Sequence, residues 1–128
     1  MTLEDLLYAL MLPSGNDAAV AVAETVGKII QRRKKKETKK TFYETFIAHM
    51  NMLSRELKLD QEWKNSHGLP LHPNHSTPHA ICQLTAAAMM DEKFREIVCC
   101  KEYEGILKNE RTGLKKICKW KNTNKLLH

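Results

Sequence analysis

Near the N-terminus, an apolar helical pattern stops at a proline and a second helical pattern starts three residues later. Leucines in residues 3–10 recur at the spacing of one helix face, and Pro13 ends that helix because proline has no N–H to donate. A long alanine-rich helical pattern begins at about Asn16. The break leaves Ser14 and Asn16 between two helices, on either side of Gly15.

Two interpretations of this break are open on the tripeptide alone. Serine and asparagine favour helix N-termini because their side-chain oxygens accept unpaired N–H groups of the first turn. Capping of the second helix is therefore the favoured interpretation of the tripeptide. The alternative is that Ser14 and Asn16 belong to a functional site. The choice between the two depends on the motifs elsewhere in the sequence.

Later helix starts are marked by residues that satisfy first-turn N–H groups. With the N-terminal helix included, these residues are Thr2 with Asp5, Thr41 with Glu44, Thr77 before Pro78, and Asp91. Two apolar faces are predicted to point into the core. The face after Thr41 comprises Phe42, Phe46, Met50, Leu53 and Leu57, and the face after Thr77 comprises Ile81, Leu84, Thr85 and Ala88.

Three other segments lack a helical period. Residues 59–75 contain one glycine and two prolines and are predicted to form a long loop. Residues 102–108 and 114–121 are candidates for strands on either side of a turn at 109–113, which predicts a β-hairpin. No element is predicted for residues 122–128.

The net charge of +6 lies in one segment. Residues 31–40 hold seven Lys/Arg and one Glu, and the other residues include 14 basic and 14 acidic ones. Such a tract can bind nucleic acid or direct nuclear import, but no second basic patch supports nucleic-acid binding. A solvated connector, or an extension of the helix expected to end near Gln31, is the favoured interpretation.

No metal site or disulfide framework is predicted. The four cysteines show no C-x-x-C spacing. Histidines and a cysteine do cluster within sixteen residues, but their spacing matches no zinc pattern and no carboxylate completes a catalytic metal site. The members of this cluster are His67, His72, His75, His79 and Cys82.

No secretion signal or membrane-spanning segment is predicted within the chain. The residues after Met1 are Thr-Leu-Glu-Asp, which are acidic where a signal peptide needs positive charge. The longest apolar runs, such as residues 6–12, are too short to span a bilayer. The compartment stays open.

Taken in chain order, four segments resemble one family, the D-alanyl-D-alanine carboxypeptidases of peptidase class S11, which are low-molecular-weight penicillin-binding proteins. The segments are TLEDLLYALMLPSGNDAAVAVAE, WKNSHGLPLHPNHSTPHAICQLTAAAM, EKFREIVCCKEYE and WKNTNKLL. The first is similar to the family's helix–SGN–helix segment and the second to its N-x-HGL loop with the helix that follows. The basic residues at about 31–41 look like an insertion.

This resemblance implies acyl transfer by a serine, without metal or cofactor. The motifs S-x-x-K, S-x-N and K-T-G surround one cleft in such enzymes. Ser14 matches the S-x-N serine, which relays a proton between the lysine and the leaving amine, and Asn16 matches the asparagine that orients the substrate. The implied ligands are D-Ala-D-Ala peptides of peptidoglycan, and β-lactams as inhibitors.

The resemblance also implies that one of the three catalytic elements is present. The family's S-x-x-K helix precedes the segment matched at residue 1, and its K-T-G strand follows the segment matched near residue 128. No S-x-x-K occurs in the chain, so no nucleophile is expected here. Arg111-Thr112-Gly113 resembles K-T-G but precedes the N-T-N stretch and falls in the predicted hairpin turn, so it is rejected as that element.

Residues 1–128 are therefore expected to be a partial peptidase S11 catalytic domain that is inactive alone. The expected fold class is α+β, a mostly helical part of the penicillin-binding-protein/β-lactamase-like fold with a C-terminal β-hairpin. One alternative is a non-catalytic helical interaction module derived from this family. A weaker alternative is a helical protein that binds nucleic acid. The family is extracytoplasmic, but the chain itself leaves localisation open.

Overall fold

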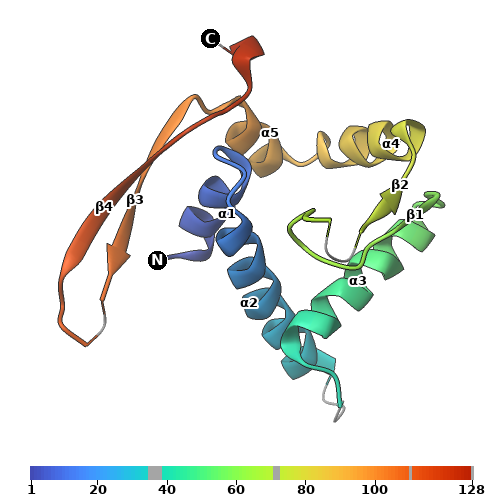
Figure 1. The fold of residues 1–128 in the computed structure, drawn as a ribbon, viewed down its shortest axis with the longest axis horizontal. Coiled ribbons are helices and arrows are strands. Elements are labelled where there is room, and N and C mark those ends of the chain that lie inside the picture. Colours follow the sequence, from blue (N-terminus) through green and yellow to red (C-terminus); the bar gives the residue numbers. More distant parts are fainter. Residues whose placement is uncertain (35–38, 71–72, 110, 128) are drawn as a thin grey trace.

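The computed structural model describes residues 1–34, 39–70, 73–109 and 111–127 (Figure 1). The helices are α1 (Leu3–Met11), α2 (Asn16–Lys34), α3 (Phe42–Glu56), α4 (Pro78–Ala88), α5 (Glu92–Cys99) and a short 3-10 turn η1 (Lys125–Leu127). The strands are β1 (Gln61–Glu62), β2 (His75–Ser76), β3 (Glu102–Lys108) and β4 (Lys115–Lys121). The fold is mostly helical with a C-terminal hairpin, as predicted.

Helices begin where capping side chains precede them. Thr2 Oγ1 accepts the Asp5 N–H at 3.0 Å, while the Asp5 carboxylate accepts the Thr2 N–H at 2.8 Å. The caps of the later helices are Thr41 with Glu44 for α3, Thr77 for α4 and Asp91 for α5. All four predicted helix starts are confirmed.

The second helix is longer than predicted. It continues past Gln31 to Lys34, and the side chains of Arg32 and Arg33 are exposed. The first part of the basic segment is thus an extension of α2, which is one of the two interpretations kept open above. Residues 35–38 lie outside the described part of the chain.

Small residues allow α1, α2 and α3 to pack closely. Ala18, Ala19, Val22 and Ala23 are buried on α2. Gly27 faces the start of α3 so closely that a Cβ atom there would lie 1.9 Å from the carbonyl oxygen of Phe42. A larger residue at position 27 would push the two helices apart.

The buried core lies between α1, α5 and the β3–β4 hairpin. Tyr8, Leu12 and Ile97 form it, with Tyr103 and Trp120 of the hairpin packed against it. The rings of Tyr8 and Tyr103 are stacked with centroids 3.7 Å apart. This core attaches the hairpin to the helix that ends at the Ser14 break.

The prediction that the apolar face of α3 points into the core is wrong for three of its five residues. Phe42, Leu53 and Leu57 are exposed by 42%, 43% and 44%, while Phe46 and Met50 are half-buried. The buried residue of α3 is Ser54. The helix packs on α2 and β1, and these contacts leave Phe42, Leu53 and Leu57 exposed.

The inward side of α4 is also displaced from the prediction. Ala80 is buried and Leu84 and Ala88 are half-buried, as a face with i, i+4 spacing. Ile81 and Thr85 are exposed, and the Thr85 hydroxyl bonds to the Ile81 carbonyl at 2.8 Å. The predicted face was therefore correct for Leu84 and Ala88 and wrong for Ile81 and Thr85.

The predicted long loop is ordered by a short ladder. β1 pairs antiparallel with β2, with Gln61 opposite Ser76 and Glu62 opposite His75. Two-residue strands have no period that a sequence pattern could detect. The prediction of an irregular segment is correct for residues 63–70 and 73–74, and it is wrong at 61–62 and 75, which lie in strands.

The predicted hairpin is confirmed. β3 pairs antiparallel with β4 in a register that places Tyr103 opposite Trp120 and Gly105 opposite Cys118. A Cβ atom on Gly105 would lie 2.5 Å from the Trp120 ring, so the glycine lets that ring lie across the strand. The chain ends differently from the prediction, because residues 125–127 form η1.

Two general predictions can be compared with the described residues. No helix among them combines the length and apolarity that a bilayer crossing requires. All four cysteines are free thiols.

Candidate active site

The break between α1 and α2 is a backbone turn around Ser14. The Gly15 N–H bonds to the Ala9 carbonyl near the end of α1 at 3.2 Å. The Gly15 carbonyl in turn accepts the Ala19 N–H at 3.0 Å, which starts α2. One residue therefore bonds to both helices, with Ser14 and Asn16 on either side of it.

The conformation of the turn is demanding for its residues. Ser14 has a φ of +59°. This value lies in the left-handed region, which residues other than glycine seldom adopt. A Cβ atom on Gly15 would lie 2.6 Å from the Ala9 carbonyl oxygen. Lys58, after α3, is the other non-glycine residue with a positive φ among the described residues, at +54°.

Ser14 and Asn16 do not cap α2. Both residues are exposed, and among the described residues neither side chain makes a hydrogen bond. The first-turn N–H of Ala18 is accepted instead by Asp17 Oδ1 at 2.8 Å. The interpretation of Ser14 and Asn16 as capping side chains is therefore wrong, and both lie at the surface with their polar atoms accessible.

Thr123, two residues after the end of β4, bonds to the end of α1. Thr123 donates to the Leu12 carbonyl twice, from its N–H at 3.0 Å and from Oγ1 at 3.2 Å. Leu12 is completely buried and lies two residues before Ser14. The Ser14 turn is thereby attached to residues more than 100 positions away in the sequence.

Asn122, the residue before Thr123, bonds to α5 and to the two residues between α5 and β3. Its side-chain amide donates to the carbonyls of Val98 at 3.1 Å and Cys100 at 3.0 Å, and its N–H bonds to the Lys101 carbonyl at 2.8 Å. In the sequence, the N-T-N stretch stands out only through the family resemblance. No local pattern indicates that these residues position the Ser14 turn.

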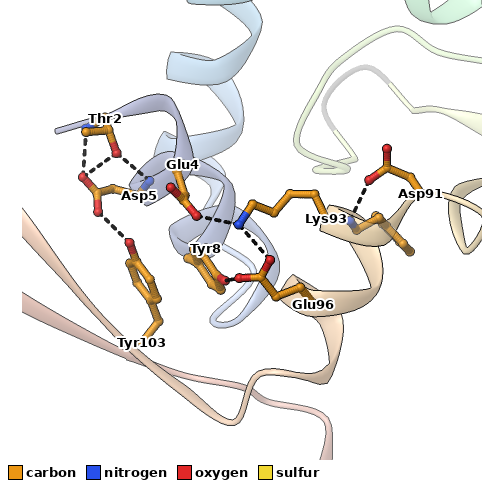
Figure 2. Close-up of polar contacts among 9 residues, drawn as sticks. Thr2, Glu4, Asp5, Tyr8, Asp91, Lys93, Glu96 and Tyr103 are labelled. Carbon is orange, nitrogen blue, oxygen red and sulfur yellow. Dashed lines mark hydrogen bonds and ion pairs between the residues drawn. The ribbon is translucent and has the colours of Figure 1, made fainter.

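A second set of contacts links α1 to the hairpin and to α5 (Figure 2). The Tyr103 hydroxyl donates to Asp5 Oδ1 at 3.1 Å, and the Tyr8 hydroxyl donates to Glu96 Oε1 at 2.8 Å. Lys93 of α5 bonds to Glu4 at 2.7 Å and to Glu96 at 2.8 Å. The Lys93 pairs are solvent-exposed, and such pairs add little stability.

These contacts change the pKa values of buried groups. Burial and the hydrogen bond to Glu96 raise the pKa of Tyr8 to about 12. Burial acts to raise the pKa of Asp5, but the hydrogen bonds from Thr2 and Tyr103 outweigh it and place that pKa below its ordinary value. At neutral pH the cluster therefore contains a neutral phenol and an ionised carboxylate.

The N-x-HGL loop is shaped by the side chains of two asparagines, the buried Asn65 and the half-buried Asn74. Asn65 Oδ1 accepts the N–H groups of His67 at 3.1 Å and Gly68 at 2.6 Å. Asn74 Oδ1 accepts the N–H groups of Lys64 at 2.8 Å and Asn65 at 3.0 Å. The loop is thus internally ordered, and Tyr43 of α3 attaches it by accepting the Ser66 N–H at 3.0 Å.

Four of the five members of the histidine cluster lie in the described part of the chain, and they are not grouped as metal ligands. Among the described residues, no group of three His, Cys, Asp or Glu side chains is placed to hold a metal ion. His67 is engaged in its own loop, because its Nδ1 accepts the Leu69 N–H at 3.2 Å. His72 lies outside the described residues.

Arg111-Thr112-Gly113 lies in the turn between β3 and β4. Gly113 has a φ of +72° and donates its N–H to the Asn109 carbonyl at 2.8 Å. Its conformation is therefore that of a turn residue and not of a strand.

An apolar groove of about 480 Å³ borders the other side of the break. It lies between the helices and the hairpin, and its lining includes Ala9, Gly15, Ala18, Leu107 and Trp120. Ser14 and Asn16 are not among its described lining residues. The two polar side chains of the turn thus lie outside this groove.

Comparison with known proteins connects this chain to one family. The family described as D-alanyl-D-alanine carboxypeptidase, peptidase S11, matches residues 1–128. A curated D-alanyl-D-alanine carboxypeptidase from Streptomyces sp. strain K15 is 33% identical over 128 residues, which are 99% of this chain and 42% of that protein.

Solved structures agree with the sequence matches. The Streptomyces K15 DD-transpeptidase superposes with a TM-score of 0.85 at 34% identity, over 99% of this chain and 46% of that one. An evolved putative penicillin-binding protein homologue from Mycobacterium tuberculosis superposes with a TM-score of 0.72 at 25% identity, over 99% and 42%. The chain spans less than half the length of these relatives.

Proposed function

Because this chain belongs to the D-alanyl-D-alanine carboxypeptidase family, peptidase S11, we propose that it carries the S-x-N element of a serine-type D-Ala-D-Ala carboxypeptidase. In this proposal Ser14 is the serine of that element and Asn16 is its asparagine. The substrate is a peptidoglycan stem peptide that ends in D-Ala-D-Ala, and β-lactams acylate the same site.

The proposed chemistry is acyl transfer in two steps. A serine hydroxyl attacks the carbonyl carbon of the penultimate D-Ala, the peptide bond to the terminal D-Ala breaks, and that residue leaves as a free amine. Ser14 Oγ passes a proton to this amine from the lysine of the S-x-x-K motif, which has taken that proton from the attacking serine. Water then hydrolyses the acyl-enzyme, and the Asn16 amide orients the peptide backbone in both steps.

The observation that carries the proposal is the accessibility of Ser14 and Asn16. Both residues are exposed, and among the described residues neither side chain makes a hydrogen bond. The turn that holds them requires a positive φ at Ser14 and a glycine at position 15. Capping does not explain why Ser14 and Asn16 stand at this position, because the N–H of Ala18 in the first turn of α2 is accepted by Asp17. A proton relay needs a hydroxyl presented in this way.

The proposal assigns the nucleophile to a segment outside residues 1–128. The sequence contains no S-x-x-K motif, and relatives that match the whole chain are more than twice as long. Residues 1–128 are then a partial catalytic domain with an insertion at about 31–41. The chain alone should consequently form no covalent adduct with a fluorescent penicillin.

A chimera tests this proposal. Residues 1–128 replace the matching segment of the Streptomyces K15 DD-transpeptidase, and the release of D-alanine from a peptide ending in D-Ala-D-Ala is measured. We expect release by the chimera and a loss of about tenfold or more in kcat/KM for Asn16→Ala, because the peptide loses an orienting hydrogen bond.

The matched control is Gln83→Ala, an exposed side-chain amide on α4 that makes no hydrogen bond among the described residues, and it should leave kcat/KM unchanged. A folded chimera that binds a fluorescent penicillin but is unaffected by Asn16→Ala would remove Asn16 from the proposed site.

The alternative function is a non-catalytic helical interaction module. The observation in its favour is that capped helices, the ordered N-x-HGL loop and the core around Tyr8 connect the chain internally. A module of this kind would fold as an independent unit and unfold in one sharp transition.

A further inference from the structure

The two faces of the β3–β4 hairpin differ in what they contact. Side chains alternate between the faces of a strand, and the face that bears Tyr103, Gly105 and Trp120 packs on the core. The opposite face, here called the outer face, bears the alternate residues. Near its base it carries two cross-strand ion pairs, Glu102 with Lys121 and Glu104 with Lys119.

Towards the turn, the outer face carries exposed apolar side chains and a pair of lysines instead of ion pairs. Ile106 lies opposite Ile117, and the two are exposed by 51% and 61%. Lys108 lies opposite Lys115 in the next pair, and Leu114 in the turn is exposed by 71%. The part of the hairpin that combines these residues, namely residues 106–109 and 111–117, is here called the hairpin tip.

Both features are unfavourable in water. Exposed apolar side chains cost free energy in proportion to the area left in contact with solvent, and like charges directly opposite each other destabilise a strand pair. The sequence from 106 to 117 contains four Lys/Arg and one Glu. The tip therefore combines a surplus of positive charge with exposed branched apolar side chains.

Such a combination matches the interface of a bilayer that contains anionic lipid. Apolar side chains enter the boundary between headgroups and acyl chains, while lysine and arginine reach the phosphates with their long side chains. Anionic headgroups between Lys108 and Lys115 would remove their mutual repulsion. Figure 1 shows the β3–β4 hairpin extending away from the helices.

We propose that the hairpin tip docks on the surface of an anionic phospholipid bilayer, with Ile106, Leu114 and Ile117 at the acyl boundary and the cations on the headgroups. This site is separate from the Ser14 turn and independent of the proposed catalytic function. The basic segment at 31–40 is a competing source of binding by charge alone, so the test has to report position.

The first experiment places a fluorophore at the tip. Leu114→Trp is introduced into the Streptomyces K15 chimera described above and mixed with phosphatidylglycerol–phosphatidylcholine vesicles that contain brominated acyl chains, and quenching is measured above the background of the chimera without this substitution. Leu126→Trp, at a position exposed by 94% on η1, is the matched control. We expect quenching of Leu114→Trp, none of Leu126→Trp, and none with phosphatidylcholine alone.

The second experiment removes apolarity without changing charge. Ile106→Thr with Ile117→Thr keeps β-branched residues in the ladder, and Leu114→Ser changes the turn without altering a strand. Each variant should bind the anionic vesicles about tenfold more weakly or worse in a sedimentation assay, with an unchanged far-UV spectrum.

Vesicle binding with an unquenched Leu114→Trp, or binding undiminished in both apolar variants, would overturn the proposal in favour of the basic segment. Retention on a nucleic-acid column without any vesicle binding would overturn it in favour of a polyanion partner.

Discussion

At the scale of single residues, Tyr8 connects the core to the surface of α5. Its ring is 3% exposed and stacked on Tyr103, while its hydroxyl donates to Glu96. The fold favours the neutral phenol because burial and a neighbouring carboxylate both disfavour the phenolate. The stability that this contact supplies must therefore depend on pH.

The sign follows from the direction of the shift. The pKa of Tyr8 is raised from 10.0 to about 12 on folding, so its contribution is fully present below pH 10 and is lost as the pH rises through about 12. We expect Tyr8→Phe to reduce the pH dependence of the unfolding free energy in that window by on the order of 2 kcal/mol. Urea titrations at several pH values measure this.

The control for Tyr8 is Tyr43→Phe, because Tyr43 lies on α3 and bonds to the N-x-HGL loop. It should retain the pH dependence that Tyr8→Phe loses. Equal slopes for the unsubstituted protein and Tyr8→Phe would show that the Tyr8 phenol does not couple to folding.

At the scale of elements, the Ser14 turn depends on the residues that follow β4. Asn122 bonds to the carbonyls of Val98 and Cys100, and its neighbour Thr123 bonds to Leu12 at the end of α1. Asn122→Ala leaves the two carbonyls without this donor, so we expect a loss of about 1–3 kcal/mol in unfolding free energy. Chemical denaturation measures it.

Asn16→Ala is the matched control for Asn122, because Asn16 is exposed and makes no side-chain hydrogen bond among the described residues. It should change stability by less than about 0.5 kcal/mol. If Asn16→Ala destabilised the protein as much as Asn122→Ala does, Asn16 would have a structural role that its exposure does not indicate.

Prediction from the sequence succeeded where the cause is local. Thr2, Thr41, Thr77 and Asp91 bond to N–H groups three residues away, so a short pattern suffices to place the helix starts. The hairpin was predictable for the same reason, because its strands are close in sequence. The S-G-N break was located correctly by the proline and by the change in helical pattern.

Prediction was wrong where the cause lies far away in the chain. A period of 3.6 residues identifies an apolar face of α3, but it does not state what covers that face, and Leu53 is exposed. The contact of Thr123 with Leu12 joins residues separated by 111 positions. The capping interpretation of Ser14 was wrong because Asp17, one residue after Asn16, takes that role.

At the scale of the whole molecule, much apolar surface is exposed. Of the side chains that the helical pattern suggests for inter-helix packing, Val22 is buried, while Leu6, Leu10, Val26, Phe46, Met50 and Leu84 are half-buried. Met90 and Leu57 are exposed by 81% and 44%. A helical layer of this kind needs a covering partner to pack uniquely.

We therefore expect the isolated chain to give a helical far-UV spectrum, to bind a dye specific for apolar surface, and to unfold over a broad temperature range. The measurements are circular dichroism, dye fluorescence and calorimetry. A sharp two-state transition of a monomer would contradict this expectation. That result would instead support the interaction module, because the chain would then be a self-sufficient domain.

The central claim is that Ser14 relays a proton in a D-Ala-D-Ala carboxypeptidase site. The measurement that tests it most directly is the acylation rate of the Streptomyces K15 chimera by a fluorescent penicillin, compared with its Ser14→Ala variant. We expect Ser14→Ala to lower that rate by about 100-fold or more, while Ser76→Ala, an exposed serine on β2, leaves it unchanged. A folded Ser14→Ala chimera that is acylated at the original rate would contradict the claim.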